Sequence, residues 1–472
     1  MTRTSAVVIG AGMGGMAAAI DLARAGVSVT VLEAASEAGG KVGRAVHDGV
    51  EFDTGPSVLT MPDVLKSLLD SDRVDLIRHD RVCTYHWPDG ASFDVHADQE
   101  ATLSSAEATF GARARDELAA FLRYSESIWR AAAPVFVYGD APSAGYAVRL
   151  GPRRLATLRH IDPLRTMEEA IRSFVREPHL IDVLMRYATY NGSDPRRAPA
   201  TLNCIAHVEL ALGSWGVRGG MFEIVGALHA TATSLGVEFV FDSPAQRIDT
   251  HVGMVASVHT DTTTYPADAV VANADVAHVL TDLLGQRAAE REPSTSGWTA
   301  VLRARRRDCA PNTVLFPADY RAEFRDLFDR RVSPSDPSVY VCAQERAHQR
   351  RGWPHHEPLF VMANAPAAAR EDESLPERVL ARLRTHGLVD DDPIVWSRTP
   401  HELAQHFPGS HGAIYGAASN SPLAAFQRPA NRCTNPRGLY FASGSAHPGG
   451  GVPLCLLSGR AAARAVLRKH GR

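Results

Sequence analysis

The sequence predicts an α/β fold with a Rossmann-type dinucleotide-binding domain, and three observations support this prediction. The first 33 residues follow a pattern of strand, glycine turn, helix and strand. Near the other end, GLYFASGS (Gly438–Ser445) reads as a short buried strand that ends in a glycine turn. The chain then closes with a stretch of helical periodicity. Both ends of the chain therefore carry elements of an α/β domain.

The N-terminal elements can be assigned one by one. Ala6–Ile9 is a short apolar run that suits a buried parallel strand. Met16–Ala25 is rich in alanine and predicts a helix that stops at Gly26. Val27–Leu32 predicts the second strand, which ends at Glu33.

The turn between the first strand and the helix has the spacing GxGxxG. It follows a strand, opens a helix and has an acid, Glu33, about 20 residues later, which is the context that a dinucleotide-binding turn requires. The glycines would form the tight turn, let a pyrophosphate approach the backbone, and let the helix pack on the strand. Glu33 would accept hydrogen bonds from a ribose. The alternative is a βαβ unit with glycine turns and no ligand. We expect the turn to bind the cofactor through Gly10, Gly12, Met13, Gly14 and Gly15.

The closing stretch, SAHPGGGVPLCLLSGRAAARAVLRKH, raises a question about its glycines. Leu454–His470 is rich in Ala, Leu and Arg at helical spacing and predicts a helix. Three consecutive glycines, Gly449–Gly451, precede it with a proline on each side. They form a tight turn, or they let a ligand approach the N–H groups of the helix N-terminus closely. Taken alone, the stretch leaves both readings open.

The composition excludes several classes of protein. The 472 residues exceed one ordinary core, so we expect two domains or one elaborated fold. A formal charge of −3 gives no general argument for binding nucleic acid. The six cysteines include no CxxC pair, which argues against a disulfide framework and fits a reducing cytoplasm. The N-terminus has no signal-peptide layout, and no apolar stretch approaches 18 residues, so we expect no spanning helix.

The segment after Glu33 resembles a known family. Gly39-Gly40-Lys41 follows the acid, and an FDTGP stretch (Phe52–Pro56) comes next. This pattern is similar to the flavoproteins that include amine oxidases and carotenoid desaturases, in which a Gly-Gly-basic triplet follows the acid and the FDxGP-like turn lies near the flavin ring. The resemblance implies FAD as a bound cofactor. It implies cofactor contacts at Gly40, Lys41, Pro56 and Ser57.

Further stretches resemble the carotenoid desaturase branch, which includes phytoene desaturase. The form SxHPGxGVP at the end of the chain, with VYVCAQ and NAP, is most similar to the hydroxycarotenoid (hydroxyneurosporene or methoxyneurosporene) 3,4-desaturases. The matching stretches are spread over most of the chain: RYATYNGSDP (Arg186–Pro195), WGVRGGM (Trp215–Met221), ADAVVANAD (Ala267–Asp275), VYVCAQER (Val339–Arg346) and FVMANAP (Phe360–Pro366).

The resemblance gives the closing glycines a purpose. A reduced flavin carries negative charge near N1, which the dipole of a helix that begins at Val452 and Pro453 would stabilise. Gly451 would let the ring lie against the main chain, and the strand end at Gly444 would meet the middle of the cofactor. Many flavoproteins have an acid after that glycine for the ribitol chain. Here the residue is Ser445, so a hydroxyl or backbone groups would have to replace it.

The family architecture implies a discontinuous FAD-binding domain with an inserted α+β substrate domain. The FAD-binding domain would comprise residues 1–70, 200–285 and 430–472. The substrate-binding, membrane-facing domain would comprise residues 71–199 and 286–429. Ser127–Leu158 mixes Trp, Tyr, Phe and Arg, which suits either a membrane-interface surface or an ordinary amphipathic packing surface.

The implied reaction needs little acid–base machinery. Hydride transfer from an allylic carbon to the flavin would leave a delocalised cation that loses a proton to a weak base. The site must mainly orient the polyene and exclude water. The catalytic candidates are His447, within the closing motif, and Arg218, in WGVRGGM; the alternatives are a structural histidine that caps the turn and a surface cation.

Four other side chains are weaker candidates. Tyr187 and Tyr190 would line the substrate channel or lie in the core, and His207 and Glu209 would bind a substrate hydroxyl or lie on a solvated helix face. His355-His356-Glu357 has no third-ligand pattern, so we expect no metal site.

The resemblance implies an FAD-dependent carotenoid desaturase acting on a 1-hydroxylated acyclic carotenoid at the 3,4 position. We expect a peripheral protein at the cytoplasmic, inner face of the membrane, because the substrate dissolves in lipid. The sequence leaves the electron acceptor open. The alternatives are a phytoene desaturase, carotenoid isomerase or amine oxidase on the same scaffold. A non-redox lipid carrier, related to the guanine-nucleotide dissociation inhibitors of small GTPases, is a further alternative.

Overall fold

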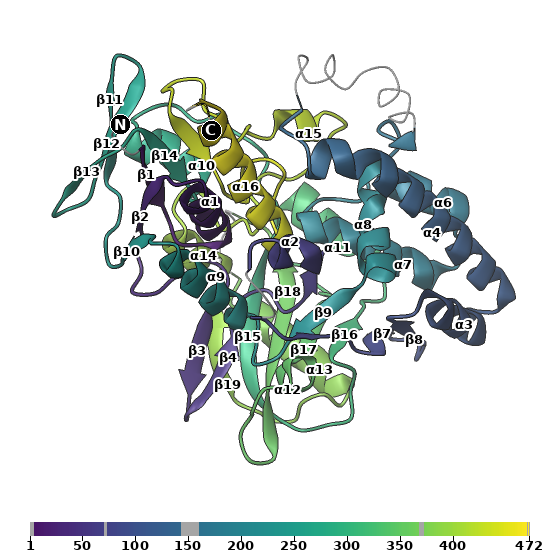
Figure 1. Cartoon of the computed structure of the whole chain (residues 1–472). Coiled ribbons are helices and arrows are strands. Elements are labelled where there is room, and N and C mark those ends of the chain that lie inside the picture. Colours follow the sequence, from purple (N-terminus) through teal and green to yellow (C-terminus); the bar gives the residue numbers. More distant parts are fainter. Residues whose placement is uncertain (1–3, 70–72, 143–159, 368–371, 470, 472) are drawn as a thin grey trace.

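A parallel sheet of five strands combines segments from both ends and the middle of the chain (Figure 1). The computed structural model describes residues 4–69, 73–142, 160–367, 372–469 and 471. Within them the sheet has the order β10-β2-β1-β14-β20, and all four strand pairs are parallel. The strands are β1 (Ser5–Ile9), β2 (Ser28–Leu32), β10 (Glu238–Val240), β14 (Ala269–Ala272) and β20 (Leu439–Phe441).

Both faces of this sheet are buried, as its nearly continuous apolar strands require. Ala6 and Val8 of β1 face one core, and Val7 and Ile9 face another. The first core lies under three helices: α1 (Met13–Arg24), α9 (Phe222–Ser234) and α16 (Val452–Lys469). The second lies under α10 (Val276–His278), the π-helical turn η6 (Val279–Leu283) and a small antiparallel sheet of β11 (Arg247–His251), β12 (Met254–His259) and β13 (Thr264–Pro266).

The structure confirms the elements expected at both ends of the chain. The first helix begins at Met13, three residues before the expected start, because the glycine turn itself forms the first helical turn. The closing helix begins at Val452, directly after the three glycines. The strand expected within Gly438–Ser445 is limited to Leu439–Phe441.

A second, mixed sheet of seven strands has the order β19-β15-β18-β17-β16-β7-β8. Its neighbours pair antiparallel except β16 and β7, which run parallel. Helix α13 (Leu375–Thr385) covers part of one face. The strands are β7 (Arg81–His86), β8 (Ser92–His96), β15 (Ser296–Arg305), β16 (Asn312–Leu315), β17 (Val339–Ala343), β18 (His356–Ala365) and β19 (Ile394–Arg398).

Helices gather at the β7–β8 end of this sheet and share a hydrophobic core with it (Figure 1). Tyr85, Phe93 and Phe316 stack within this core. The helical elements are α3 (Gln99–Phe110), α4 (Ala112–Ala132), η1 (Ala133–Val137), α6 (Met167–Phe174), α7 (Pro178–Arg186), η3 (Tyr187–Asn191), η4 (Ala200–Asn203), α8 (Cys204–His207), η5 (Val208–Leu212), α11 (Tyr320–Phe324) and η7 (Arg325–Arg330).

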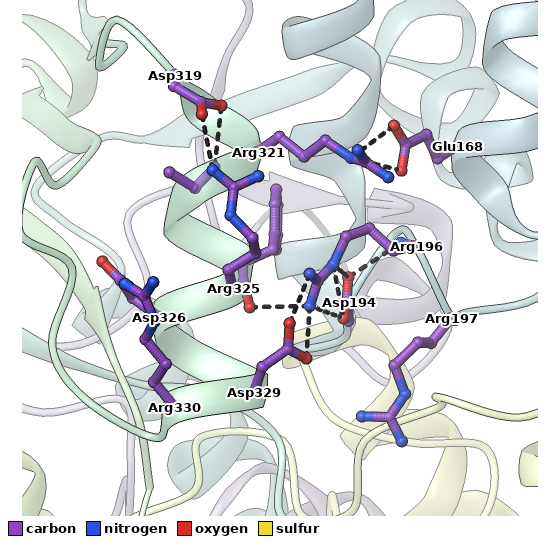
Figure 2. A network of polar contacts seen from close by, with 12 residues as sticks. Glu168, Asp194, Arg196, Arg197, Asp319, Arg321, Arg325, Asp326, Asp329 and Arg330 are labelled. Carbon is purple, nitrogen blue, oxygen red and sulfur yellow. Dashed lines mark hydrogen bonds and ion pairs between the residues drawn. The ribbon is translucent and has the colours of Figure 1, made fainter.

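Figure 2 shows a charged network that fastens these helices to the segment after β16. Arg196 bonds both oxygens of Asp194, which is fully buried, and also pairs with Asp329 of η7. Arg321 reaches Glu168 of α6 in the same network. The network thus joins three parts of the chain that lie far apart in sequence.

The remaining elements lie outside these three sheets. They are β3 (Arg44–His47), β4 (Val50–Asp53), β5 (Leu59–Thr60), α2 (Pro62–Lys66), β6 (Leu76–Ile77), β9 (Ser214–Val217), α12 (Gln344–His348), α14 (Pro400–His406) and α15 (Ala424–Gln427). All strands of the parallel sheet fall within the predicted segments 1–70, 200–285 and 430–472, and all strands of the seven-stranded sheet fall outside them. The domain boundaries themselves stay a prediction.

Candidate functional site

One cavity of about 900 Å³ runs between the two sheets and touches both ends of the chain. Its lining is mainly apolar with a few polar groups, which is the usual character of a small-molecule site. It includes most of the residues predicted to bind the cofactor: Gly10, Gly12, Met13, Glu33, Gly40, Lys41, Pro56, Ser57, Gly444, Gly451, Val452 and Pro453. The cavity therefore brings together segments more than 400 residues apart.

Glu33 lies beside the glycine turn at the end of β2. Its two carboxylate oxygens accept hydrogen bonds from the backbone N–H groups of Ala11 (2.6 Å) and Ala35 (2.9 Å). Each oxygen keeps lone-pair capacity for a further donor. The carboxylate is thus fixed where it faces the cavity.

Gly14 and Gly15 are not among the residues that line the cavity, and their small size serves packing. A Cβ on Gly14 would lie 1.8 Å from the carbonyl oxygen of Ala442, which follows β20. A Cβ on Gly15 would lie 2.0 Å from the carbonyl oxygen of Gly10. The two glycines let α1 approach the sheet closely and so hold the turn in place.

Three half-buried cations line the cavity: Lys41, Arg398 and Arg428. Among the described residues, none of the three forms an ion pair within 4 Å, and their hydrogen bonds go to backbone carbonyl groups. Burial lowers the pKa of all three, and that of Arg428 falls to about 10. Charges that are partly withdrawn from water gain from a partner of opposite charge, so these cations fit a site for an anionic group such as the pyrophosphate of a dinucleotide.

The closing glycines have separate roles. Gly449 and Gly451 have φ values of +141° and +98°, which side chains rarely adopt. A Cβ on Gly450 would lie 2.8 Å from the ring of Tyr415. Gly450 and Gly451 also line the cavity, directly before α16. The glycines therefore form a tight turn and also bring the backbone to the cavity, so the two interpretations of this stretch are compatible.

Asp275 is a site residue that sequence reasoning did not single out. It caps α10, lines the cavity and lies beside Ser445, the position where many flavoproteins have an acid; the Ser445 hydroxyl accepts a hydrogen bond from the backbone N–H of Val276. Burial raises the pKa of Asp275. The hydrogen bond that its carboxylate accepts from the backbone N–H of Ala277, and the charge of Lys41, act against this rise. The sequence signal that could have identified Asp275 is its position just after the apolar strand in ADAVVANAD (Ala267–Asp275). The structure thus places a carboxylate beside Ser445 from a different strand.

His447 is buried and lines the cavity. Burial lowers its pKa to about 4, so the ring is neutral at neutral pH. Its Nε2 lies 3.2 Å from the carbonyl oxygen of Gly139, which makes Nε2 the protonated nitrogen and leaves the lone pair on Nδ1. Asn431 also fixes the main chain, because its amide donates to the His447 carbonyl. This geometry is compatible with both readings of His447.

Arg218 lies away from the cavity. Its exposed guanidinium pairs with Asp75 (2.5 Å) and contacts Gln349. Its role in catalysis stays a prediction.

The four weaker candidates lie in different environments. Tyr190 lines the cavity, whereas Tyr187 lies in the core. Glu209 is buried, which contradicts the solvated-face reading for this residue, because η5 turns it toward the aromatic core. His207 is half-buried.

Two further findings concern metals and membranes. No group of three or more His, Cys, Asp or Glu side chains in the described part of the chain is arranged to hold a metal ion. No described helix is both long enough and apolar enough to cross a membrane. Of the segment proposed to lie at a membrane interface, residues 143–158 fall outside the described residues.

Comparisons with known proteins agree with this geometry. The family described as flavin containing amine oxidoreductase matches residues 13–467. A hydroxyneurosporene desaturase from Rhodobacter capsulatus is 35% identical, over 99% of this chain and 98% of its own. A 1-hydroxycarotenoid 3,4-desaturase from a Flavobacterium species is 31% identical, over 96% and 97%. A variant of putrescine oxidase has a similar fold, with a TM-score of 0.65 and 15% identity over 99% of both chains.

Proposed function

The chain belongs to the flavin-containing amine oxidoreductase family and to its carotenoid desaturases, and from this premise we propose that it binds FAD and desaturates a 1-hydroxylated acyclic carotenoid at the 3,4 position. The observation that carries the proposal is the similarity, over nearly the whole chain, to a hydroxyneurosporene desaturase. The cavity adds support, because it joins a dinucleotide-type turn to a large apolar space.

The residues present fit FAD. Gly10, Gly12 and Met13 at the N-terminus of α1 would hold the pyrophosphate, and Glu33 would hold the adenosine ribose. The half-buried cations Lys41, Arg398 and Arg428 would balance its negative charge. The flavin end would contact Pro56, Ser57, Gly444, Gly451, Val452 and Pro453, with Asp275 and Ser445 at the ribitol chain.

Bound FAD would supply the acceptor for the hydride that leaves an allylic carbon of the substrate. The protein's own task is to orient the polyene and keep water out, which the apolar walls of the cavity serve. Loss of the proton needs only a weak base, because the cation is strongly acidic. Neutral His447 could receive that proton at Nδ1.

The cavity mouth supports a membrane-surface location. Phe426 lines the cavity and is 55% exposed, and its ring packs edge-to-face on Phe136. Leu423 and Leu164 are also strongly exposed, next to cavity-lining Pro422 and Pro163. Exposed apolar side chains at the mouth would let a lipid-soluble substrate enter without crossing water. Flotation with liposomes at low and high salt tests this, and no association at either salt concentration would exclude it.

The function is tested by anaerobic incubation of the purified protein with liposomes that carry 1-hydroxyneurosporene or, separately, phytoene. We expect the flavin band to bleach, and the polyene absorption to move to longer wavelength, with the hydroxylated substrate only. Bleaching with phytoene alone would show that the protein is a phytoene desaturase of the same family. A folded protein without a flavin band after purification and FAD addition would favour the lipid carrier.

A further inference from the structure

A fourth positive charge in the cavity also forms no ion pair within 4 Å among the described residues. Arg186, the last residue of α7, lines the cavity among the rings of three tyrosines. Its guanidinium carbon lies 5.8 Å from the ring centre of Tyr85, 5.2 Å from that of Tyr190 and 5.7 Å from that of Tyr340. Its electrostatic partner of opposite charge is Glu209, and the two form no ion pair within 4 Å. The cage holds the group in place through aromatic faces.

The hydrogen bonds of Arg186 are few and long. Nη1 approaches the hydroxyl groups of Tyr85 at 3.4 Å and Tyr190 at 3.3 Å. The described part of the chain offers Nε and Nη2 no hydrogen-bond acceptor. A guanidinium has five N–H donors and is always protonated, so Arg186 keeps donor capacity for an oxygen in the cavity.

Two other buried polar atoms near this cage lack a partner among the described residues. The hydroxyl of Tyr320, a cavity-lining residue only 2% exposed, has no partner within 3.5 Å among the described residues; the nearby Ser338 donates its own proton to Glu323. One carboxylate oxygen of Glu209, which is 7% exposed, also makes none, while the other oxygen lies 3.4 Å from the Tyr187 hydroxyl. Unpartnered buried polar groups are rare and call for an explanation. A bound oxygen could accept a hydrogen bond from the Tyr320 hydroxyl, whereas the Glu209 oxygen needs a ligand that donates a proton, such as a hydroxyl.

The charge balance favours a neutral ligand. Glu209 interacts electrostatically with both Arg186 and Tyr190. Its negative charge offsets that of Arg186, so the cage presents hydrogen-bond donors with little net charge. A neutral alcohol or ether oxygen suits this environment better than a second carboxylate would, because a carboxylate would add an uncompensated negative charge.

The cage also lies near the place expected for the flavin ring. Tyr340, one wall of the cage, bonds Ser57 through its hydroxyl at 2.7 Å. In a 1-hydroxylated carotenoid the oxygen on C1 lies only about 4 Å from C3, given ordinary bond lengths. An anchor a short distance beyond the ring would therefore hold the C3–C4 bond over it. The rest of the polyene would extend toward the apolar mouth at Phe136 and Phe426.

We propose that Arg186, with Tyr190 and Tyr320, binds the oxygen on C1 of the substrate and thereby determines which bond is desaturated. This assignment rests on the proposed function for the identity of the substrate. Arg186 acts by recognition and positioning. Its donors serve a hydroxyl or a methoxy oxygen equally, since both accept hydrogen bonds, and a carotenoid with hydrogen at C1 leaves them unpaired.

The test compares substrates within one protein preparation. Wild type, Arg186→Met and Tyr190→Phe are given 1-hydroxyneurosporene, 1-methoxyneurosporene and neurosporene in liposomes, and the rate of flavin bleaching is measured for each. Because the ratio of two rates from one preparation does not depend on the folded fraction, partial misfolding does not affect it. Arg172→Met is the matched control, since Arg172 lies on α6, pairs with Glu168 and is half exposed.

We expect wild type to prefer both oxygenated substrates over neurosporene by roughly 10- to 100-fold, the range for a hydrogen bond to a charged donor. Arg186→Met should reduce this ratio to near one, and Tyr190→Phe should reduce it partly. Arg172→Met should keep the wild-type ratio. An unchanged ratio in Arg186→Met would overturn the assignment. Absence of any wild-type preference for the two oxygenated substrates over neurosporene would also overturn it.

A binding measurement separates this inference from the proposed reaction. Trp129 lines the cavity, so bound carotenoid should quench tryptophan fluorescence in the oxidised protein. If no carotenoid bleaches the flavin but the oxygenated compounds bind more tightly in wild type than in Arg186→Met, the proposed reaction fails and the oxygen site stands. If wild type shows no binding preference for an oxygen at C1, the oxygen site fails whatever the turnover.

Discussion

The side-chain oxygens of Ser57 and Tyr340 lie 2.7 Å apart, and this hydrogen bond joins the loop after β4 to strand β17 of the seven-stranded sheet. Tyr340 donates its own proton to Asn312 at 2.7 Å, so Ser57 must be the donor to Tyr340. The bond ties a segment expected to contact the cofactor to a wall of the substrate space. It is a point at which the two halves of the site are fixed relative to each other.

Removing this hydroxyl should loosen the site. Tyr340→Phe leaves the buried Asn312 oxygen and the Ser57 hydroxyl without their partner, and we expect a loss of about 1–3 kcal/mol of unfolding free energy. Chemical denaturation measures it. Tyr440→Phe is the matched control, because the buried Tyr440 hydroxyl has no hydrogen-bond partner among the described residues. Equal stability of the two variants would contradict the proposed importance of the bond.

Gly14 should tolerate no side chain. Gly14→Ala would place a Cβ 1.8 Å from the Ala442 carbonyl oxygen and force α1 away from the sheet. We expect poor folding and loss of flavin, seen in the yield of folded protein and in its flavin absorbance. Gly226→Ala in α9 is the control, since a Cβ there meets nothing within 4 Å. That change should be neutral or stabilise by up to about 1 kcal/mol. Normal flavin content in Gly14→Ala would refute the packing argument.

Glu33→Ala should weaken flavin retention with the fold largely kept. The carboxylate would no longer be available to the ribose, and the Ala11 and Ala35 N–H groups would lose their acceptor. The flavin-to-protein absorbance ratio after gel filtration measures retention. Glu37→Ala, at an exposed position nearby, serves as the control. Full flavin occupancy in Glu33→Ala would remove Glu33 from the ribose role.

The charged network of Figure 2 should depend most on Arg196. Asp194 is fully buried, so Arg196→Ala would leave its carboxylate without a countercharge and cost about 3–5 kcal/mol. Thermal and chemical unfolding measure this. Arg130 pairs with Glu126 on the exposed side of α4, and Arg130→Ala should change stability by no more than about 0.5 kcal/mol. Similar effects of the two changes would show that the network contributes little.

Acid should destabilise the protein partly through His447. Burial lowers its pKa from 6.5 to about 4, so between these values the unfolded chain binds more protons than the folded chain. Stability is therefore complete above pH 6.5 and is lost as the pH falls through this window, by about 3 kcal/mol for this one residue. Unfolding curves from pH 7 to 4 should show a smaller loss in His447→Asn than in wild type. His401→Asn, at an exposed position, should follow wild type; equal pH dependence of all three proteins would disprove the assignment.

The sequence predicts those parts of the fold that depend on near neighbours. The βαβ unit around Gly10 and the helix after Gly451 follow from local spacing, glycine chemistry and apolar periodicity, and the structure has both within a few residues. The start of α1 was placed too late, because the glycines of the turn take part in the helix.

Contacts between distant segments could not be predicted in the same way. Asp275 meets Ser445 because β14 and β20 pair in the parallel sheet, and nothing in either stretch specifies that pairing. Arg186 enters the cavity because α7 ends against the aromatic core, and in sequence it is one arginine among many. Such residues become visible only when the topology is known.

The order of strands in the parallel sheet has a consequence for biosynthesis. Strand β20 and helix α16 come from the last 35 residues, yet α16 packs along α1, which is made first. During translation the contact between α1 and α16 can form only after the segment of β20 and α16 has been synthesised. The cavity is lined by residues of both helices, so it cannot take its final shape before that point.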